Sequence, residues 1–132
     1  MPVTYHIDPV RKMMRTTCNS PLTFAEVLDN IRGLKVDPAC QGRLHALVDL
    51  STADLVMDGD QLRIALAELN TLRPRTQFDM LALVATRDAM YGMMRMFEVI
   101  AAPYFGTIRV FRVVSEAEAW LASPSGESGL GG

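Results

Sequence analysis

One segment of the chain combines two patterns of apolar residues. Six consecutive apolar residues, from Met80 to Ala85, are bounded by polar ones. Such a run is typical of a strand that is covered on both faces, as in a parallel sheet with helices packed against it. A polar break at residues 86–88 follows, and apolar residues then recur at helical spacing as far as Pro103. The segment therefore predicts a buried strand that leads into a long helix.

The helix predicted after this strand has one broad apolar face. Asp88 places a negative charge at the positive end of the helix dipole, and Pro103 ends the helix. At 100° per residue the apolar side chains fill an arc of about 160°; they are Ala89, Met90, Met93, Met94, Met96, Phe97, Ile100 and Ala101. Methionine fills gaps in cores and also coats adaptable binding surfaces, so this face predicts core packing, a dimer interface or an apolar pocket.

The remaining elements follow from turn residues and helix caps. Capping boxes are predicted to begin helices at Thr23, Asp58 and Ser115, and Gly33 is predicted to end the first of them. Strands are predicted at residues 3–7, 10–18, 44–50, 80–85 and 107–113, and helices at 23–32, 58–72, 88–102 and 115–121.

This order of elements, ββαβαβαβα, predicts an α/β fold with a mixed, mostly parallel five-stranded sheet. The first two strands should form an antiparallel hairpin, and strands joined through helices should be parallel. Polar residues in the last strand place it near the sheet edge. We expect a single domain over residues 1–122 and a disordered tail over residues 123–132, where serine, proline and glycine dominate.

Composition narrows the classes of partner. The 132 residues are 49% hydrophobic and 21% charged, with a formal net charge of -2, so no basic field for a nucleic acid is expected. No apolar run is long enough to span a bilayer and no leader pattern opens the chain, which predicts a soluble, cytoplasmic protein without stable membrane insertion. Cys18 and Cys40 are expected to be free thiols.

Three strings of residues resemble the STAS domain, in particular its SpoIIAA-like branch, which borders on the CRAL-TRIO lipid-transfer fold. They are the strand end at 47–51 (LVDLS), the helix segment at 91–97 (YGMMRMF) and the terminal segment at 110–121 (VFRVVSEAEAWL). The resemblance covers residues 3–122 and implies a regulatory or interaction domain. Family members that act as anti-sigma-factor antagonists carry a phosphorylatable serine where this chain has Asp58 and Asp60, which a kinase cannot switch.

Two groups of residues are candidate sites. Ligands of parallel α/β sheets favour the carboxyl ends of the strands, which predicts a crevice of Asp49, Ser51, Thr52, Thr86, Arg87 and Asp88. The helix over residues 88–102 offers a candidate binding surface, namely Tyr91, Met94, Arg95, Phe97 and Glu98. Each group also has a purely structural interpretation. A helix cap accounts for Asp88 and a backbone or arginine partner for Asp49, and a solvated ridge accounts for Tyr91, Arg95 and Glu98.

Three functions are compatible with these patterns. The first is a non-enzymatic regulatory or protein-interaction domain, expected as a homodimer that uses the helix around Tyr91 to Phe97. The second is a carrier or sensor of a small apolar, lipid-like ligand, with the same helix as the wall of a cavity. The third is a small enzyme that uses Asp49, Arg87 and Asp88. No catalytic residue, cofactor or metal site is predicted, because no histidine or cysteine spacing matches a known pattern.

Overall fold

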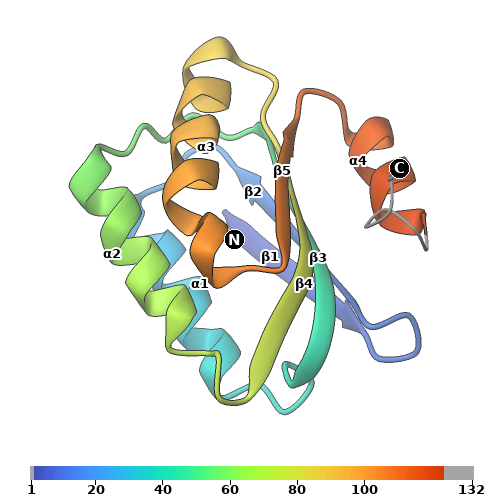
Figure 1. The fold of residues 1–132 in the computed structure, drawn as a ribbon. Coiled ribbons are helices and arrows are strands. Elements are labelled where there is room, and N and C mark those ends of the chain that lie inside the picture. Colours follow the sequence, from blue (N-terminus) through green and yellow to red (C-terminus); the bar gives the residue numbers. More distant parts are fainter. Residues whose placement is uncertain (1, 124–132) are drawn as a thin grey trace.

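The computed structural model describes residues 2–123, whose strands form one five-stranded sheet (Figure 1). The strands are β1 (Val3–Asp8), β2 (Met13–Asn19), β3 (Gly42–Thr52), β4 (Thr76–Val84) and β5 (Thr107–Phe111). The helices are α1 (Phe24–Lys35), α2 (Gly59–Asn70), α3 (Asp88–Ala101) and α4 (Val114–Ala122), with a short 3-10 helix η1 (Ala102–Tyr104). The predicted α/β class and order of elements are confirmed. The predicted tail lies, from residue 124 onward, outside the described residues.

The strand order in the sheet is the same as the order along the chain. β1 pairs with β2 antiparallel, and β2 to β5 are parallel neighbours. Each of α1, α2 and α3 therefore connects two adjacent parallel strands and advances in the same direction, so crossovers of one handedness place all three on one face. Figure 1 shows these three helices on one side of the sheet and α4 on the other. β5 lies at an edge, as its polar residues predict.

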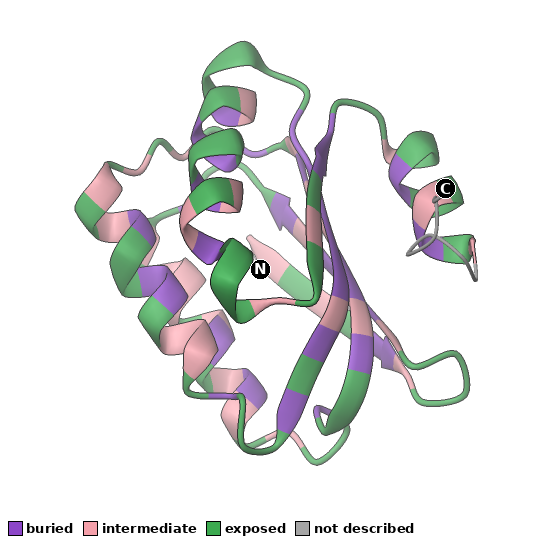
Figure 2. Cartoon of the chain, in the orientation of Figure 1, coloured by how far each residue is buried: buried purple, intermediate pink, exposed green. Residues whose placement is uncertain are grey.

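β4 is buried on both faces, as its apolar run predicts. Alternate side chains of the strand point to opposite faces. Leu81 and Leu83 belong to the core beneath α1, α2 and α3, whereas Ala82 and Val84 belong to a smaller core beneath α4. Figure 2 shows the buried residues concentrated along the central strands. The sheet therefore separates two cores, and the larger one lies on the side of the three crossover helices.

Two of the three predicted capping boxes are present. Thr23 Oγ1 accepts a hydrogen bond from the Glu26 amide at 3.2 Å, and Glu26 Oε1 accepts one from the Thr23 amide at 2.9 Å. Asp58 and Gln61 make the same reciprocal pair at the start of α2. Each capping box provides hydrogen-bond acceptors for two backbone amides that have no partner within the helix. The sequence therefore predicts these two helix starts correctly.

Two predicted helix boundaries are wrong. α1 does not end at Gly33 but continues to Lys35, since the next residue, Leu34, is buried in the core and keeps the last turn in place. Ser115 is not a cap, because α4 begins one residue earlier and no side chain caps it. At the end of α1, burial of Leu34 therefore outweighs the local glycine signal.

Candidate ligand cavity between the sheet and the crossover helices

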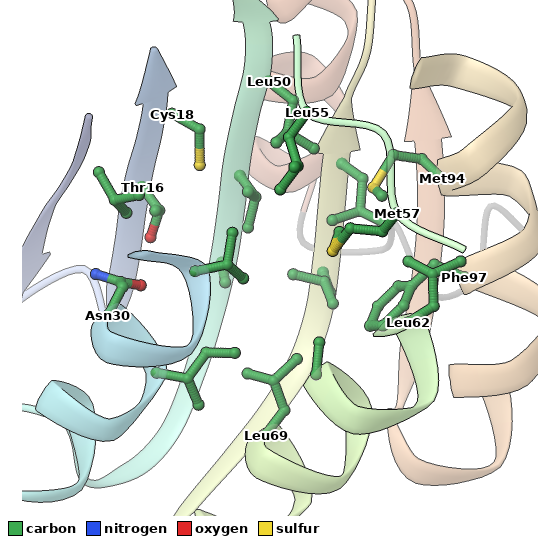
Figure 3. Close-up of a pocket in the computed structure, with 18 of the residues that line it drawn as sticks. Thr16, Cys18, Asn30, Leu50, Leu55, Met57, Leu62, Leu69, Met94 and Phe97 are labelled. Atoms are coloured by element: carbon green, nitrogen blue, oxygen red, sulfur yellow. The ribbon is translucent and has the colours of Figure 1, made fainter. Parts of the chain in front are cut away.

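A cavity of about 130 Å³ lies between the sheet and the layer formed by α1, α2 and α3 (Figure 3). The sheet and each of the three helices contribute residues to its wall. Leu83 comes from the sheet, Ile31 from α1, Leu62 from α2 and Phe97 from α3. Protein interiors usually leave few voids larger than a water molecule. A space of this size within the main core is therefore a candidate binding site.

No charged side chain lines the cavity. Its lining is apolar except for Thr16 and Cys18 on β2 and Asn30 on α1, so the polar groups are confined to one side. Burial raises the pKa of the Cys18 thiol to about 11, and the negative charge of Asp49 adds to this rise. The thiol is therefore neutral at physiological pH, and the interior of the cavity carries no charge.

Methionine side chains form much of the opposite wall. Met90, Met93 and Met94 of α3 are buried and line the cavity, and Met57 joins them from the segment before α2. Unbranched thioether side chains adjust to irregular shapes at low cost. Met96, which the periodicity assigns to the same apolar face, is instead 49% exposed, because it lies on the outer side of α3. The methionine-rich helix α3 thus both packs on the sheet and forms a wall of the cavity.

The segment that joins β3 to α2 contributes partly exposed residues to the cavity lining. Val48 lies in the middle of the central strand β3 on the helix side, yet it is only partly buried. Leu55 and Met57 of the joining segment line the cavity and are also partly exposed. The Met57 amide donates a hydrogen bond to Met93 Sδ at 2.9 Å, which holds this segment against α3. The joining segment therefore forms the rim of the cavity.

The structure divides the candidate binding surface on α3. Met94 and Phe97 are 5% and 6% exposed and face the cavity. Tyr91, Arg95 and Glu98 lie on the outer side, where Arg95 Nε is 3.0 Å from Glu98 Oε1 and Arg95 Nη1 is 3.4 Å from the Tyr91 hydroxyl. The five residues consequently do not form one surface, since the helical period places two of them inside and three outside.

At the end of β3, the first half of the predicted crevice forms local pairs. The Ser51 hydroxyl and amide both donate to Asp49 Oδ1, at 2.6 and 2.9 Å. The Thr52 hydroxyl donates to Asn19 Oδ1 at 2.7 Å and contacts the Cys18 carbonyl oxygen at 3.3 Å. These polar groups form hydrogen bonds with one another at the ends of β2 and β3. Their presence there is therefore explained without a ligand.

The second half of the predicted crevice forms a separate group around Arg112. Its Nη1 donates to Asp88 Oδ1 at 2.6 Å and to the Thr86 carbonyl oxygen at 3.2 Å, and its guanidinium stacks 4.1 Å from the Tyr91 ring centroid. Arg87 is exposed. Within residues 2–123 no hydrogen bond or ion pair joins this group to Asp49, and no cluster of metal-ligating side chains occurs there.

Comparisons with protein-family models, curated proteins and solved structures gave no match. In the part of the chain that the structure describes, no helix is long and apolar enough to cross a bilayer.

Two polar cavity residues, Thr16 and Asn30, were not among the sequence-based candidates. Asn30 follows Val27 by three residues and so falls on the inward stripe of α1, where a polar residue is unusual. Thr16 alternates with Met14 and Cys18 on the buried side of β2. A polar residue within an otherwise apolar stripe is thus the signal that could have identified these two residues from the sequence.

The pH dependence of Cys18 alkylation tests whether the thiol is neutral inside the cavity. About half of an unperturbed thiol is ionised at pH 9, whereas a pKa of about 11 leaves about 1% of Cys18 as thiolate. We expect the rate of iodoacetamide labelling of Cys18 in the folded protein, measured by peptide mass mapping, to rise about tenfold per pH unit up to about pH 10. The same peptide in the urea-unfolded chain is the control. A plateau near pH 9 in the folded protein would contradict a raised pKa.

Proposed function

We propose that this protein binds a small apolar ligand in the cavity beneath α3 and acts as a carrier or sensor rather than as an enzyme. The observation that supports the proposal is an uncharged cavity of about 130 Å³ inside the main core. Binding sites for small molecules are typically concave, apolar and supplied with a few polar groups, which describes this lining.

The volume of the cavity sets the size of the ligand. A cavity of about 150 Å³ lined by leucine, isoleucine and phenylalanine is known to hold benzene or xenon. By that measure the cavity accommodates about six to eight non-hydrogen atoms, such as one small ring, and is too small for a long lipid chain. Ligands of this size bind weakly, and we expect a Kd of about 1 mM for an unsubstituted ring.

The non-catalytic role and the family resemblance belong to the same proposal. The acidic and basic side chains near Asp49 and Asp88 lie outside the cavity lining and pair with their neighbours, which leaves no acid or base facing a bound molecule. The element order and the antiparallel first strand pair are those that the resemblance to the STAS domain implies. A regulatory role and a cytoplasmic location are proposed on the same basis.

Filling the cavity should abolish binding without unfolding the protein. Ala65 on α2 is buried and lines the cavity, so Ala65→Leu places extra carbon atoms in the empty space. In the wild type, benzene at about ten times its Kd should stabilise the folded state by about 1.4 kcal/mol and raise the Tm by roughly 5 °C. In Ala65→Leu this shift should vanish, while the free energy of unfolding without ligand stays equal or increases by about 1 kcal/mol.

Ala67→Leu is the matched control, because Ala67 lies on the exposed side of the same helix. This variant should respond to benzene as the wild type does. A benzene-induced shift that survives in Ala65→Leu, or the absence of any shift in the wild type, would contradict a ligand cavity.

We propose as a second function that the chain forms a homodimer, with the outer side of α3 as the interface to a partner. The observation that favours it is the exposure of apolar side chains there: Val99 is 73% exposed and Met96 is 49% exposed, three residues apart on one helix. This interface replaces the one expected around Met94 and Phe97, whose side chains face the core.

Native mass spectrometry tests this interface. A dimer in the wild type should become a monomer in Val99→Asp, because the substitution places a charge at the centre of an apolar contact. Val10→Asp is the control, since Val10 is exposed in the distant turn between β1 and β2. A monomeric wild type, or a dimer that persists in Val99→Asp, would rule the interface out.

A further inference from the structure

We infer that the ligand of this cavity is a neutral ring compound with a single hydroxyl or carbonyl group, and that Thr16 and Asn30 bind that group. The inference rests on the proposed function, which it extends from an apolar ligand in general to one chemical class. Four features of the cavity carry it: a hydroxyl without a protein partner, an amide at the same end of the cavity, the absence of charge, and an apolar wall of methionine and phenylalanine at the other end.

The Thr16 hydroxyl is the first feature. Two polar residues in the described part of the chain are buried, Thr16 at 5% exposure and Thr76 at 2%. The Thr76 hydroxyl donates to the Cys40 carbonyl oxygen at 2.8 Å. No side-chain hydrogen bond within residues 2–123 involves the Thr16 hydroxyl, which points into the cavity (Figure 3). The Thr16 hydroxyl is therefore available to a ligand that enters the cavity, as a donor or as an acceptor.

The side chain of Asn30 is the second feature. Asn30 is partly buried on α1 and lines the cavity on the same side as Thr16 (Figure 3). In Figure 3 its amide lies opposite the Thr16 hydroxyl at the same end of the cavity. Its side chain likewise makes no hydrogen bond to the described residues, and an amide offers both donors and an acceptor. Thr16 and Asn30 together can therefore donate to a ligand oxygen and accept from a ligand hydroxyl.

The lack of charge excludes ionised ligands. A carboxylate in this space would need a cationic side chain, and an ammonium group would need an anionic one. The lining contains neither, and the Cys18 thiol next to Thr16 in the same row of side chains is neutral. Two hydrogen bonds do not offset the desolvation of a full charge. The polar group of the ligand is therefore a hydroxyl or a carbonyl rather than an acid or an amine.

The opposite end of the cavity suits the ring. Met93, Met94 and Phe97 line it from α3, and Met57 lines it from the rim. Thioether sulfur atoms make favourable contacts with aromatic rings at about 5 Å. A ring placed there, with its oxygen toward β2 and α1, would meet an apolar wall at one end and the two unpaired polar groups at the other.

Phenol and benzene provide the direct test, because they share the ring and differ by one hydroxyl. We would measure both dissociation constants by NMR titration in the wild type and in Thr16→Val, which removes the hydroxyl and keeps the shape of the side chain. We expect Thr16→Val to raise the dissociation constant of phenol about five-fold and to leave that of benzene unchanged. Thr16→Ser retains the hydroxyl and should keep the preference for phenol. Asn30→Leu should also raise the dissociation constant of phenol. Benzoate should not bind the wild type.

The outcomes separate the inference from the proposed function. If benzene binds and the ratio of the phenol and benzene constants is the same in the wild type and Thr16→Val, the hydroxyl has no role and the inference is wrong, although the cavity still binds ligands. If Thr16→Ser loses the preference as well, the effect comes from packing and the inference is also wrong. If neither compound binds the folded wild type, the proposed function fails and the inference fails with it.

Discussion

The structure depends on the burial of β4 from both sides. A strand whose neighbouring side chains point in opposite directions and are all apolar requires a core on each face of the sheet. Here α4 alone covers one face at β4, with Val84 and Phe111 beneath it, while α1, α2 and α3 share the other. The three crossover helices therefore have to cover most of the sheet between them, and the cavity lies in the core that they enclose.

The cavity forms where small side chains meet across the core. Ala46 of β3 and Ala65 of α2 both line it, and the methionines of α3 do not fill the space that these residues leave. Because native cores are packed to the density of organic crystals, an empty volume of this size gives up contact energy that larger side chains would supply. A ligand that occupies the space restores those contacts. The uncharged lining and the polar groups on β2 and α1 then decide which molecules fit.

The features that were predicted correctly depend on chemistry local to the chain. The apolar run of β4 and the capping boxes at Thr23 and Asp58 each involve residues close in sequence. The cavity was not predictable in the same way, because its volume depends on the sizes of side chains that come from three helices and four strands. Periodicity did identify the apolar face of α3, with a cavity wall as one of its three interpretations. The rule for parallel sheets placed Asp49 and Asp88 beyond strand ends, but it could not show that Ser51 and Arg112 already pair with them.

Diffraction from crystals of the protein pressurised with xenon would show whether an accessible, apolar cavity exists beneath α3. Xenon enters apolar cavities of this size without needing hydrogen bonds, so it tests the space independently of any ligand chemistry. Our account predicts a xenon site bordered by Val48, Leu83 and Met93. If xenon leaves that position empty and solid packing of side chains occupies it, the account is contradicted.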